Sequence, residues 1–191
     1  MGAVTTTAGI GHNNGPTMEP GHSWRKHVWT KARADLLPTL PIEVVRLRVK
    51  RAAELGLPYK TYASVRASTG HDVIGLLFST NALDLLRAND RLEAEKAAKI
   101  AAIRNCDRVS LYYPGIAPDS LIPPCDAAAP APAPWLSWSE TRQQLVSALR
   151  SRGRPCGGYL IIGETGAERE WAAAGKTAGF LTGERFFNGA A

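Results

Sequence analysis

Three short apolar runs, separated by helical stretches, constrain the fold of this chain more than any other feature. The runs are "DVIGLLFS" (72–79), "RVSLYY" (108–113) and "YLIIG" (159–163). The first and third are continuous apolar runs, which are typical of strands buried on both faces of a parallel sheet, and the second is expected to be a further strand. Helices are expected over about 82–105, 138–151 and 166–178. The alternation predicts an α/β fold with a small, mainly parallel sheet of three or four strands and flanking helices, with 185–187 as the fourth strand.

Two of the expected helices begin with the same local signal. Ser137 stands three residues before Glu140, and Thr165 stands three residues before Glu168. In this spacing, the capping box, the hydroxyl accepts a hydrogen bond from the backbone N–H of the acidic residue. The carboxylate in turn accepts one from the N–H of the hydroxyl residue. The two pairs therefore predict that helices begin close to residues 138 and 166.

Composition divides the chain into five segments. Residues 114–136 hold seven of the thirteen prolines. Because proline lacks a backbone N–H, this stretch is expected to be a linker outside the interior of helices and sheets. The predicted segments are a flexible arm (1–21), a basic helical module (22–70), the first part of the α/β domain (71–113), the Pro/Ala-rich linker (114–136) and the second part of the α/β domain (137–191).

The positive charge of the chain is concentrated near its amino end. The formal net charge is +6, but residues 22–70 hold ten Lys or Arg and three acidic residues, so this quarter carries +7 and the remainder −1. Charge gathered in this way suits a polyanionic partner, whereas an even distribution would chiefly favour solubility. A solvated helix face is the other explanation for such a run.

Residues 47–66 resemble the helix-turn-helix segments of DNA-binding proteins. In that family a small residue packs helix against helix and a glycine four positions later makes the turn, and Ala52 and Gly56 fall at these positions. Apolar residues also fall at the core positions of the family, namely Leu55, Leu57 and Val65. Arg51 and Tyr62 depart from the pattern, since an apolar and a β-branched residue are usual there.

The resemblance implies that the second helix of the pair would enter the major groove of DNA. Its outward-facing candidates for base or phosphate contacts are then Lys60, Thr61, Ser64 and Arg66. The alternative is two helices of an ordinary core, joined by a tight turn, with a basic rim that is only solvated.

Upstream, "HSWRKHVWTKARADLL" (22–37) interleaves tryptophan with basic residues and is expected to be helical over 24–37. Cations contact phosphate without reading sequence, and exposed indoles could stack on unpaired bases. Two tryptophans on one helical stripe would otherwise be core anchors. Across both regions, the cations expected to contact phosphate are Arg25, Lys26, Lys31, Arg33, Arg46, Lys50, Lys60 and Arg66.

A second resemblance lies in the carboxyl-terminal third. "YLIIGETGAEREWAAAGKTAGF" (159–180) is similar to the fourth motif of the haloacid dehalogenase superfamily, in which a buried strand ends in Gly-Asp and a second acid follows four residues later. The matching residues, with Glu in place of Asp, are Gly163, Glu164 and Glu168. "DVIGLLFSTN" (72–81) would correspond to the second motif, with Ser79 or Thr80 as the phosphate-binding hydroxyl at the carboxyl end of a strand.

This second resemblance implies a phosphohydrolase that acts on a phosphorylated small molecule, with Mg²⁺ held by Glu164 and Glu168. The superfamily takes its nucleophilic aspartate from a DxD-type first motif, and no apolar run of this sequence ends in DxD. The interpretation is therefore either a dehalogenase-like enzyme or a degenerate relative of one.

The remaining features place the chain in a broad class. Cys106, Cys125 and Cys156 form no CxxC and have no neighbouring histidine, which suits packing thiols in a reducing compartment. No stretch approaches the ~18 apolar residues of a membrane span, and the amino end lacks a secretory signal.

The leading hypothesis is a non-catalytic, cytoplasmic nucleic-acid-binding protein that uses the basic helical surface and needs no metal or cofactor. A protein partner or a homodimer is a further expected partner. A third hypothesis is an interaction adaptor that uses the arm and the Pro/Ala-rich linker as docking segments.

Overall fold

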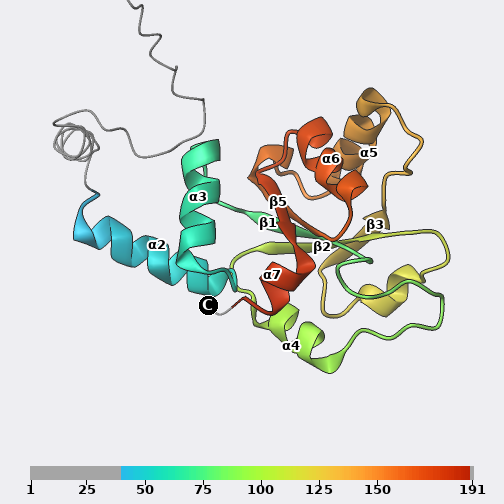
Figure 1. Cartoon of the computed structure of the whole chain (residues 1–191), viewed down its shortest axis with the longest axis horizontal. Coiled ribbons are helices and arrows are strands. Elements are labelled where there is room, and N and C mark those ends of the chain that lie inside the picture. The colour runs from blue at the N-terminus through green and yellow to red at the C-terminus, as the bar shows by residue number, and fades with distance from the viewer. Residues whose placement is uncertain (1–39, 190–191) are drawn as a thin grey trace, which may run out of the picture. The chain divides into compact units, whose positions relative to one another are not determined.

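Five parallel strands form one sheet in the order β3-β2-β1-β4-β5 (Figure 1). The computed structural model describes residues 40–189. The strands are β1 (Gly75–Ser79), β2 (Asp107–Tyr112), β3 (Ala127–Pro130), β4 (Tyr159–Gly163) and β5 (Gly179–Thr182). The predicted α/β class with a parallel sheet and flanking helices is thus confirmed, with five strands in place of three or four.

The apolar runs became strands because each lies where both faces of the sheet are covered. Every residue of β1 and of β4 is buried. In the register of the three central strands, Leu77 pairs with Val109 on one side and Ile161 on the other. Alternate residues of β1 point into different cores, since Phe78 belongs to one apolar cluster and Leu77 to the other.

Two layers of helices cover the two faces. The helices are α2 (Ile42–Glu54), α3 (Tyr59–Thr69), α4 (Ala94–Ala102), α5 (Trp138–Arg150), α6 (Gly166–Gly175) and α7 (Gly183–Phe187), with short 3-10 helices η1 (Pro118–Leu121) and η2 (Cys156–Gly158). The first core packs residues of α2, α3, α4 and α7 against the sheet. The second packs α5 and α6 against the other face (Figure 1).

Both predicted capping boxes are present. The hydroxyl of Ser137 accepts a hydrogen bond from the N–H of Glu140, and that of Thr165 accepts one from the N–H of Glu168. In both cases the glutamate carboxylate accepts a hydrogen bond from the backbone N–H of the hydroxyl residue. The helices α5 and α6 therefore begin at the predicted residues.

Several local predictions were wrong. Residues 185–187 belong to the helix α7, because the Thr182 hydroxyl caps its first turn and Phe186 is buried in the core. Only residues 94–102 of the expected helix over 82–105 are helical. Before them, residues 80–93 form turns and irregular backbone, in which Leu83 and Leu85 are buried.

The Pro/Ala-rich segment 114–136 is also not a simple linker. Residues 127–130 form β3, which pairs with β2 at the edge of the sheet. An edge strand can end on Pro130 because one side of its backbone needs no partner strand. The predicted arm (1–21) and the predicted helix at 24–37 lie outside the described residues.

Among the described residues, no helix is both long enough and apolar enough to cross a bilayer.

Candidate functional site

The helical hairpin of α2 and α3 has the secondary structure expected for residues 47–66. Four residues, 55–58, separate the two helices. Gly56 adopts a φ of +66°, a left-handed conformation that favours glycine. The N–H of Leu57 donates to the carbonyl of Ala52 over 2.9 Å, and both residues are buried. The turn is therefore fixed by a helix-ending glycine and by apolar anchors on both sides.

The two residues that depart from the helix-turn-helix pattern anchor the hairpin to the sheet. Arg51 donates from Nε to Asp72 over 3.0 Å, from Nη1 to Glu54 over 3.1 Å and from Nη2 to the carbonyl of Val73 over 2.9 Å. The Tyr62 hydroxyl donates to Asp72 over 2.8 Å. Burial and this carboxylate raise the pKa of Tyr62. Arg51 is consequently a structural cation and is not available to a ligand.

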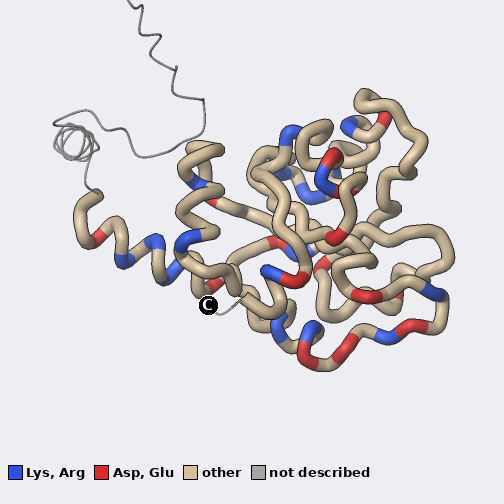
Figure 2. Tube along the Cα trace, viewed as in Figure 1, with Lys and Arg blue, Asp and Glu red and all other residues tan. Residues whose placement is uncertain are grey.

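The other predicted contact residues of the hairpin differ in their solvent exposure and in their ion pairs. Lys50, Lys60 and Ser64 are exposed, and neither lysine forms an ion pair within residues 40–189. Arg46 is exposed and pairs with Glu43 over 2.8 Å. The basic residues of α2 and α3 appear in blue in Figure 2.

Thr61 and Arg66 are half-buried. Arg66 donates to the Tyr62 hydroxyl over 3.4 Å and lies 3.7 Å from Asp72, so part of its charge is compensated. The four cations predicted further upstream lie outside the described residues; they are Arg25, Lys26, Lys31 and Arg33.

The residues of the dehalogenase resemblance gather at the carboxyl edge of the sheet. The strand order reverses between β1 and β4, and ligands of open α/β sheets bind beyond the carboxyl ends of strands at such a point. Ser79 ends β1, Thr80 directly follows it, and Glu164 directly follows β4. Topology thus brings together residues that are some 85 positions apart in the sequence.

Glu168 lies fully buried at the centre of this edge, and four donors saturate its carboxylate. Oε2 accepts from the backbone N–H groups of Glu164, over 2.6 Å, and Thr165, over 2.8 Å. Oε1 accepts from Nδ2 of Asn81 over 3.0 Å and from the Tyr113 hydroxyl over 3.3 Å. A carboxylate has about four lone-pair sites, so no site remains for a metal ion.

Asn81 and Tyr113 are site residues that the sequence analysis missed. Tyr113 directly follows β2 and Asn81 lies two residues after β1, and this position after a buried strand is the signal that could have found them. Burial is the main cause that raises the pKa of Tyr113, and the negative charge of Glu168 raises it further.

The two candidate hydroxyls at this edge are also engaged. Ser79 Oγ accepts from the N–H of Ala82 over 3.1 Å, and Thr80 Oγ1 accepts from the N–H of Tyr113 over 3.3 Å. Both side chains are fully buried. Glu164 is exposed, and its Oε2 accepts from the N–H of Gly183 over 3.0 Å. Within residues 40–189, no group of three or more His, Cys, Asp or Glu could hold a metal ion.

The fold also gathers cations that the sequence analysis did not single out. Arg142 and Arg150 lie two turns apart on α5 and line a cleft together with Arg154 and Lys176. The net charge of −1 outside residues 22–70 hides this group, because acidic residues elsewhere balance it. The spacing of Arg142, Val146 and Arg150, at i, i+4 and i+8, is the one local signal of a basic stripe.

No protein-family model, curated protein or solved structure matches this chain. Its function must therefore be inferred from the geometry and charge of its own residues.

Proposed function

We propose that this protein is a non-catalytic, cytoplasmic nucleic-acid-binding protein that contacts phosphate through the basic surface of its helical hairpin. The observation that carries the proposal is the pair of exposed lysines, Lys50 on α2 and Lys60 on α3, without ion pairs among the described residues. Exposed cations on two helices joined by a short turn suit the phosphates on either side of a groove.

Further residues would extend this surface. Ser64 and Thr61 lie on α3 beside Lys60 and carry hydroxyls that can donate to phosphate or to base edges. Arg46 can exchange its exposed partner Glu43 for a phosphate at small cost, because surface ion pairs contribute little. In the sequence, the cations at positions 25, 26, 31 and 33 would add non-specific affinity.

The placement in the cytoplasm is supported by the cysteines. Cys106, Cys125 and Cys156 are all free thiols. A chain whose cysteines stay unpaired suits a reducing compartment.

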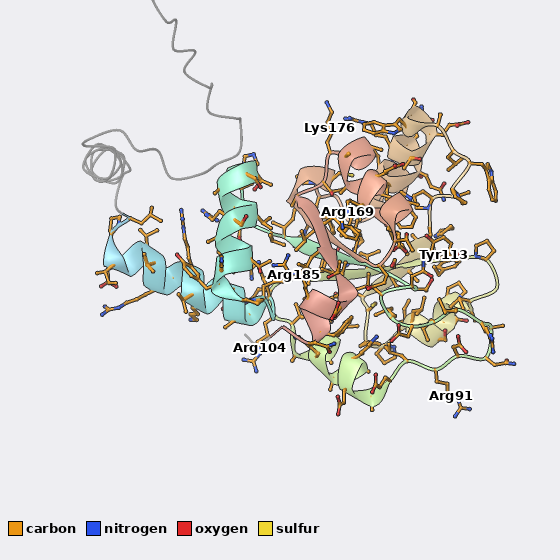
Figure 3. All side chains as sticks on the ribbon, in the orientation of Figure 1. Arg91, Arg104, Tyr113, Arg169, Lys176 and Arg185 are labelled. Atoms are coloured by element: carbon orange, nitrogen blue, oxygen red, sulfur yellow. The ribbon has the colours of Figure 1, made fainter. Side chains whose placement is uncertain are left out.

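The decisive experiment is a salt titration of binding by fluorescence anisotropy, with duplex and single-stranded oligonucleotides. The double variant K50Q/K60Q removes two charges from the hairpin. R87Q/R91Q is the matched control, because both arginines are exposed in the loop before α4 and Arg91 lies far from α2 and α3 (Figure 3).

The hairpin variant should lower the slope of log affinity against log salt by about 1.8 on duplex, which is ~0.9 for each phosphate that the variant no longer neutralises. The control should keep the wild-type slope. Negligible binding to both kinds of oligonucleotide at low salt, or equal losses in the two variants, would reject the proposal.

The alternative function is a dehalogenase-like phosphohydrolase or a degenerate relative. It is favoured by the gathering of Ser79, Thr80, Glu164 and Glu168 at the reversal of strand order. The saturated carboxylate of Glu168 does not fit the proposed Mg²⁺ ligand pair, so we derive no step through a metal. Screening phosphomonoesters with and without Mg²⁺ tests this alternative, and no turnover in either condition removes it.

A protein-interaction adaptor is a third candidate, because Trp135 and Trp138 are 81% and 60% exposed at the end of the Pro/Ala-rich segment. Exposed tryptophans are frequent anchors of protein interfaces. Affinity purification that recovers one stoichiometric protein and no nucleic acid would favour this function over the first.

A further inference from the structure

A cleft beside α5 gathers four cations from three separate segments. Arg142 and Arg150 come from α5, Arg154 from the loop that follows it, and Lys176 from the residue after α6. The cleft has a volume of about 420 Å³. It belongs to the helical layer of α5 and α6, which packs on the opposite face of the sheet from α2 and α3. It is therefore separate from the hairpin surface.

Within the part of the chain that the structure describes, no acidic side chain pairs with the cations of this cleft. None of the described residues that line it is acidic. Within residues 40–189, the four cations form no ion pair and donate no side-chain hydrogen bond. By contrast, Arg152 in the same loop as Arg154 pairs with Asp107. Like charges held around one cavity repel one another, and an anion between them would relieve that repulsion.

The shape of the surface suits a ligand larger than a single ion. A second hollow, of about 700 Å³, lies along α5 and shares Arg142, Val146 and Arg150 with the cleft. The two arginines are eight residues apart, which is about 12 Å along the helix axis. Val146 stands between them, 39% exposed, and supplies an apolar contact. Figure 3 shows Lys176 pointing outward from the end of α6.

Cys156 gives the cleft a built-in reporter. Its thiol is half-buried among the lining residues. Burial raises the pKa of this thiol, and the nearby positive charge of Arg142 opposes that rise. An anion bound beside Arg142 would cover the sulfur and weaken the effect of the arginine, so alkylation would slow for both reasons.

We infer that this cleft is a binding site for a phosphate-bearing ligand, with Arg142, Arg150, Arg154 and Lys176 as its phosphate contacts. Guanidinium groups bind phosphate through paired N–H donors, and an ammonium group adds a point charge. The phosphate can belong to a small phosphorylated molecule or to a nucleic-acid backbone.

The test is the rate of alkylation of Cys156 by iodoacetamide, followed by mass spectrometry of its peptide. The probes are inorganic phosphate, adenosine monophosphate and a single-stranded oligothymidylate, each compared with chloride at equal ionic strength. With a probe at about ten times its Kd, the rate should fall about tenfold, because about a tenth of the clefts stay empty. The buried thiol of Cys125 in the same sample is the internal control.

Variants separate this site from the hairpin. In R142Q/R150Q, the probes should no longer protect Cys156. Each variant is measured with and without probe, because the loss of Arg142 by itself raises the pKa of the thiol and so changes its alkylation rate. R87Q/R91Q, matched in charge, and K50Q/K60Q should keep it. If K50Q/K60Q lost oligonucleotide binding but Cys156 stayed protected by the probes, the hairpin would be a separate binding surface and the inference about the cleft would stand.

Protection by phosphate or by the mononucleotide would support a small phosphorylated ligand. Protection by the oligonucleotide alone would support a nucleic-acid backbone that reaches this face of the sheet. No protection by any probe, or protection that survives in R142Q/R150Q, would overturn the inference.

Discussion

The side-chain amide of Asn81 donates a hydrogen bond to Oε1 of Glu168 over 3.0 Å. Asn81 follows β1 and Glu168 lies in the first turn of α6, directly after β4. The bond therefore joins the segments that follow the two strands between which the sheet reverses its order, at the edge where α/β proteins bind ligands. In this protein, the carboxylate of Glu168 at that edge accepts hydrogen bonds from the backbone after β4 and from the Asn81 side chain after β1.

We predict that Glu168→Gln lowers the free energy of unfolding by about 1–3 kcal/mol. The amide nitrogen of glutamine cannot accept a hydrogen bond, so at least one buried donor at this edge would lose its partner. Urea denaturation measures the change. Glu170→Gln, at an exposed position of the same helix, is the control and should shift stability by less than ~0.5 kcal/mol. Equal stability of the two variants would show that the four donors do not depend on the carboxylate.

The second prediction concerns Gly75 in β1, which lies close to the ring of Tyr159 in β4. A Cβ added to Gly75 would lie 2.2 Å from Cε1 of Tyr159. We expect Gly75→Ala to cost about 1–3 kcal/mol, since the core must shift to admit the methyl group. The control is Gly166→Ala, where a Cβ meets nothing within 4 Å and alanine favours the helix. Thermal unfolding should give Gly166→Ala a clearly higher Tm than Gly75→Ala. The reverse order would contradict the packing of the Tyr159 ring against β1.

The central strands were predictable because burial on both faces demands continuous apolar runs, and such runs are visible without any structure. The two edge strands were not. β3 reads Ala-Ala-Ala-Pro, which contains no strand-favouring residue, and β5 reads Gly-Phe-Leu-Thr, which is only four residues long and begins with glycine. Their pairing is decided by the neighbouring strands and not by local preference.

The candidate site shows the same division. The capping-box spacing predicted the bond between Thr165 and Glu168, because it depends on four consecutive residues. It could not predict that Asn81 and Tyr113 fill the other carboxylate oxygen, since these residues are distant in the sequence and meet only through the sheet. The cluster around Arg142 likewise combines segments that only the packed fold brings together.

A third prediction concerns alkaline pH. Tyr159 is buried and donates to Oδ2 of Asp107 over 2.7 Å. Burial, followed by this hydrogen bond, raises the pKa of Tyr159 above its ordinary value. A raised pKa in the folded state means that the folded protein keeps a proton that the unfolded chain releases. Stability is then fully present below about pH 10 and falls as the pH rises further.

Tyr159→Phe should therefore make the loss of stability between about pH 9.5 and 11 shallower, measured by denaturation at a series of pH values. Tyr112→Phe controls for removal of a phenol from another strand of the sheet, β2, since within the described part of the chain the Tyr112 hydroxyl makes no hydrogen bond. An unchanged pH dependence in Tyr159→Phe would show that its phenol is not the group that titrates.

The fourth prediction separates the structural cation of the hairpin from its binding cations. Arg51 reaches Asp72, Glu54 and the carbonyl of Val73 at once because its guanidinium carries donors in a planar fork. Arg51→Lys keeps the charge, but its single ammonium nitrogen cannot reach acceptors that Arg51 contacts from three different nitrogens, so we expect a loss of about 1–3 kcal/mol in urea denaturation. Its neighbour Lys50 is exposed, and Lys50→Gln should change stability by less than ~0.5 kcal/mol.

The two variants should behave in the opposite way toward nucleic acid. At a temperature where both stay folded, Lys50→Gln should weaken oligonucleotide binding and reduce its salt dependence, because one fewer phosphate is neutralised. Arg51→Lys should leave both unchanged, since its side chain is only 17% exposed and faces the acidic residues that bind it. A binding defect in the folded Arg51→Lys protein, with normal binding by Lys50→Gln, would place the phosphate contacts elsewhere than on the exposed face of the hairpin.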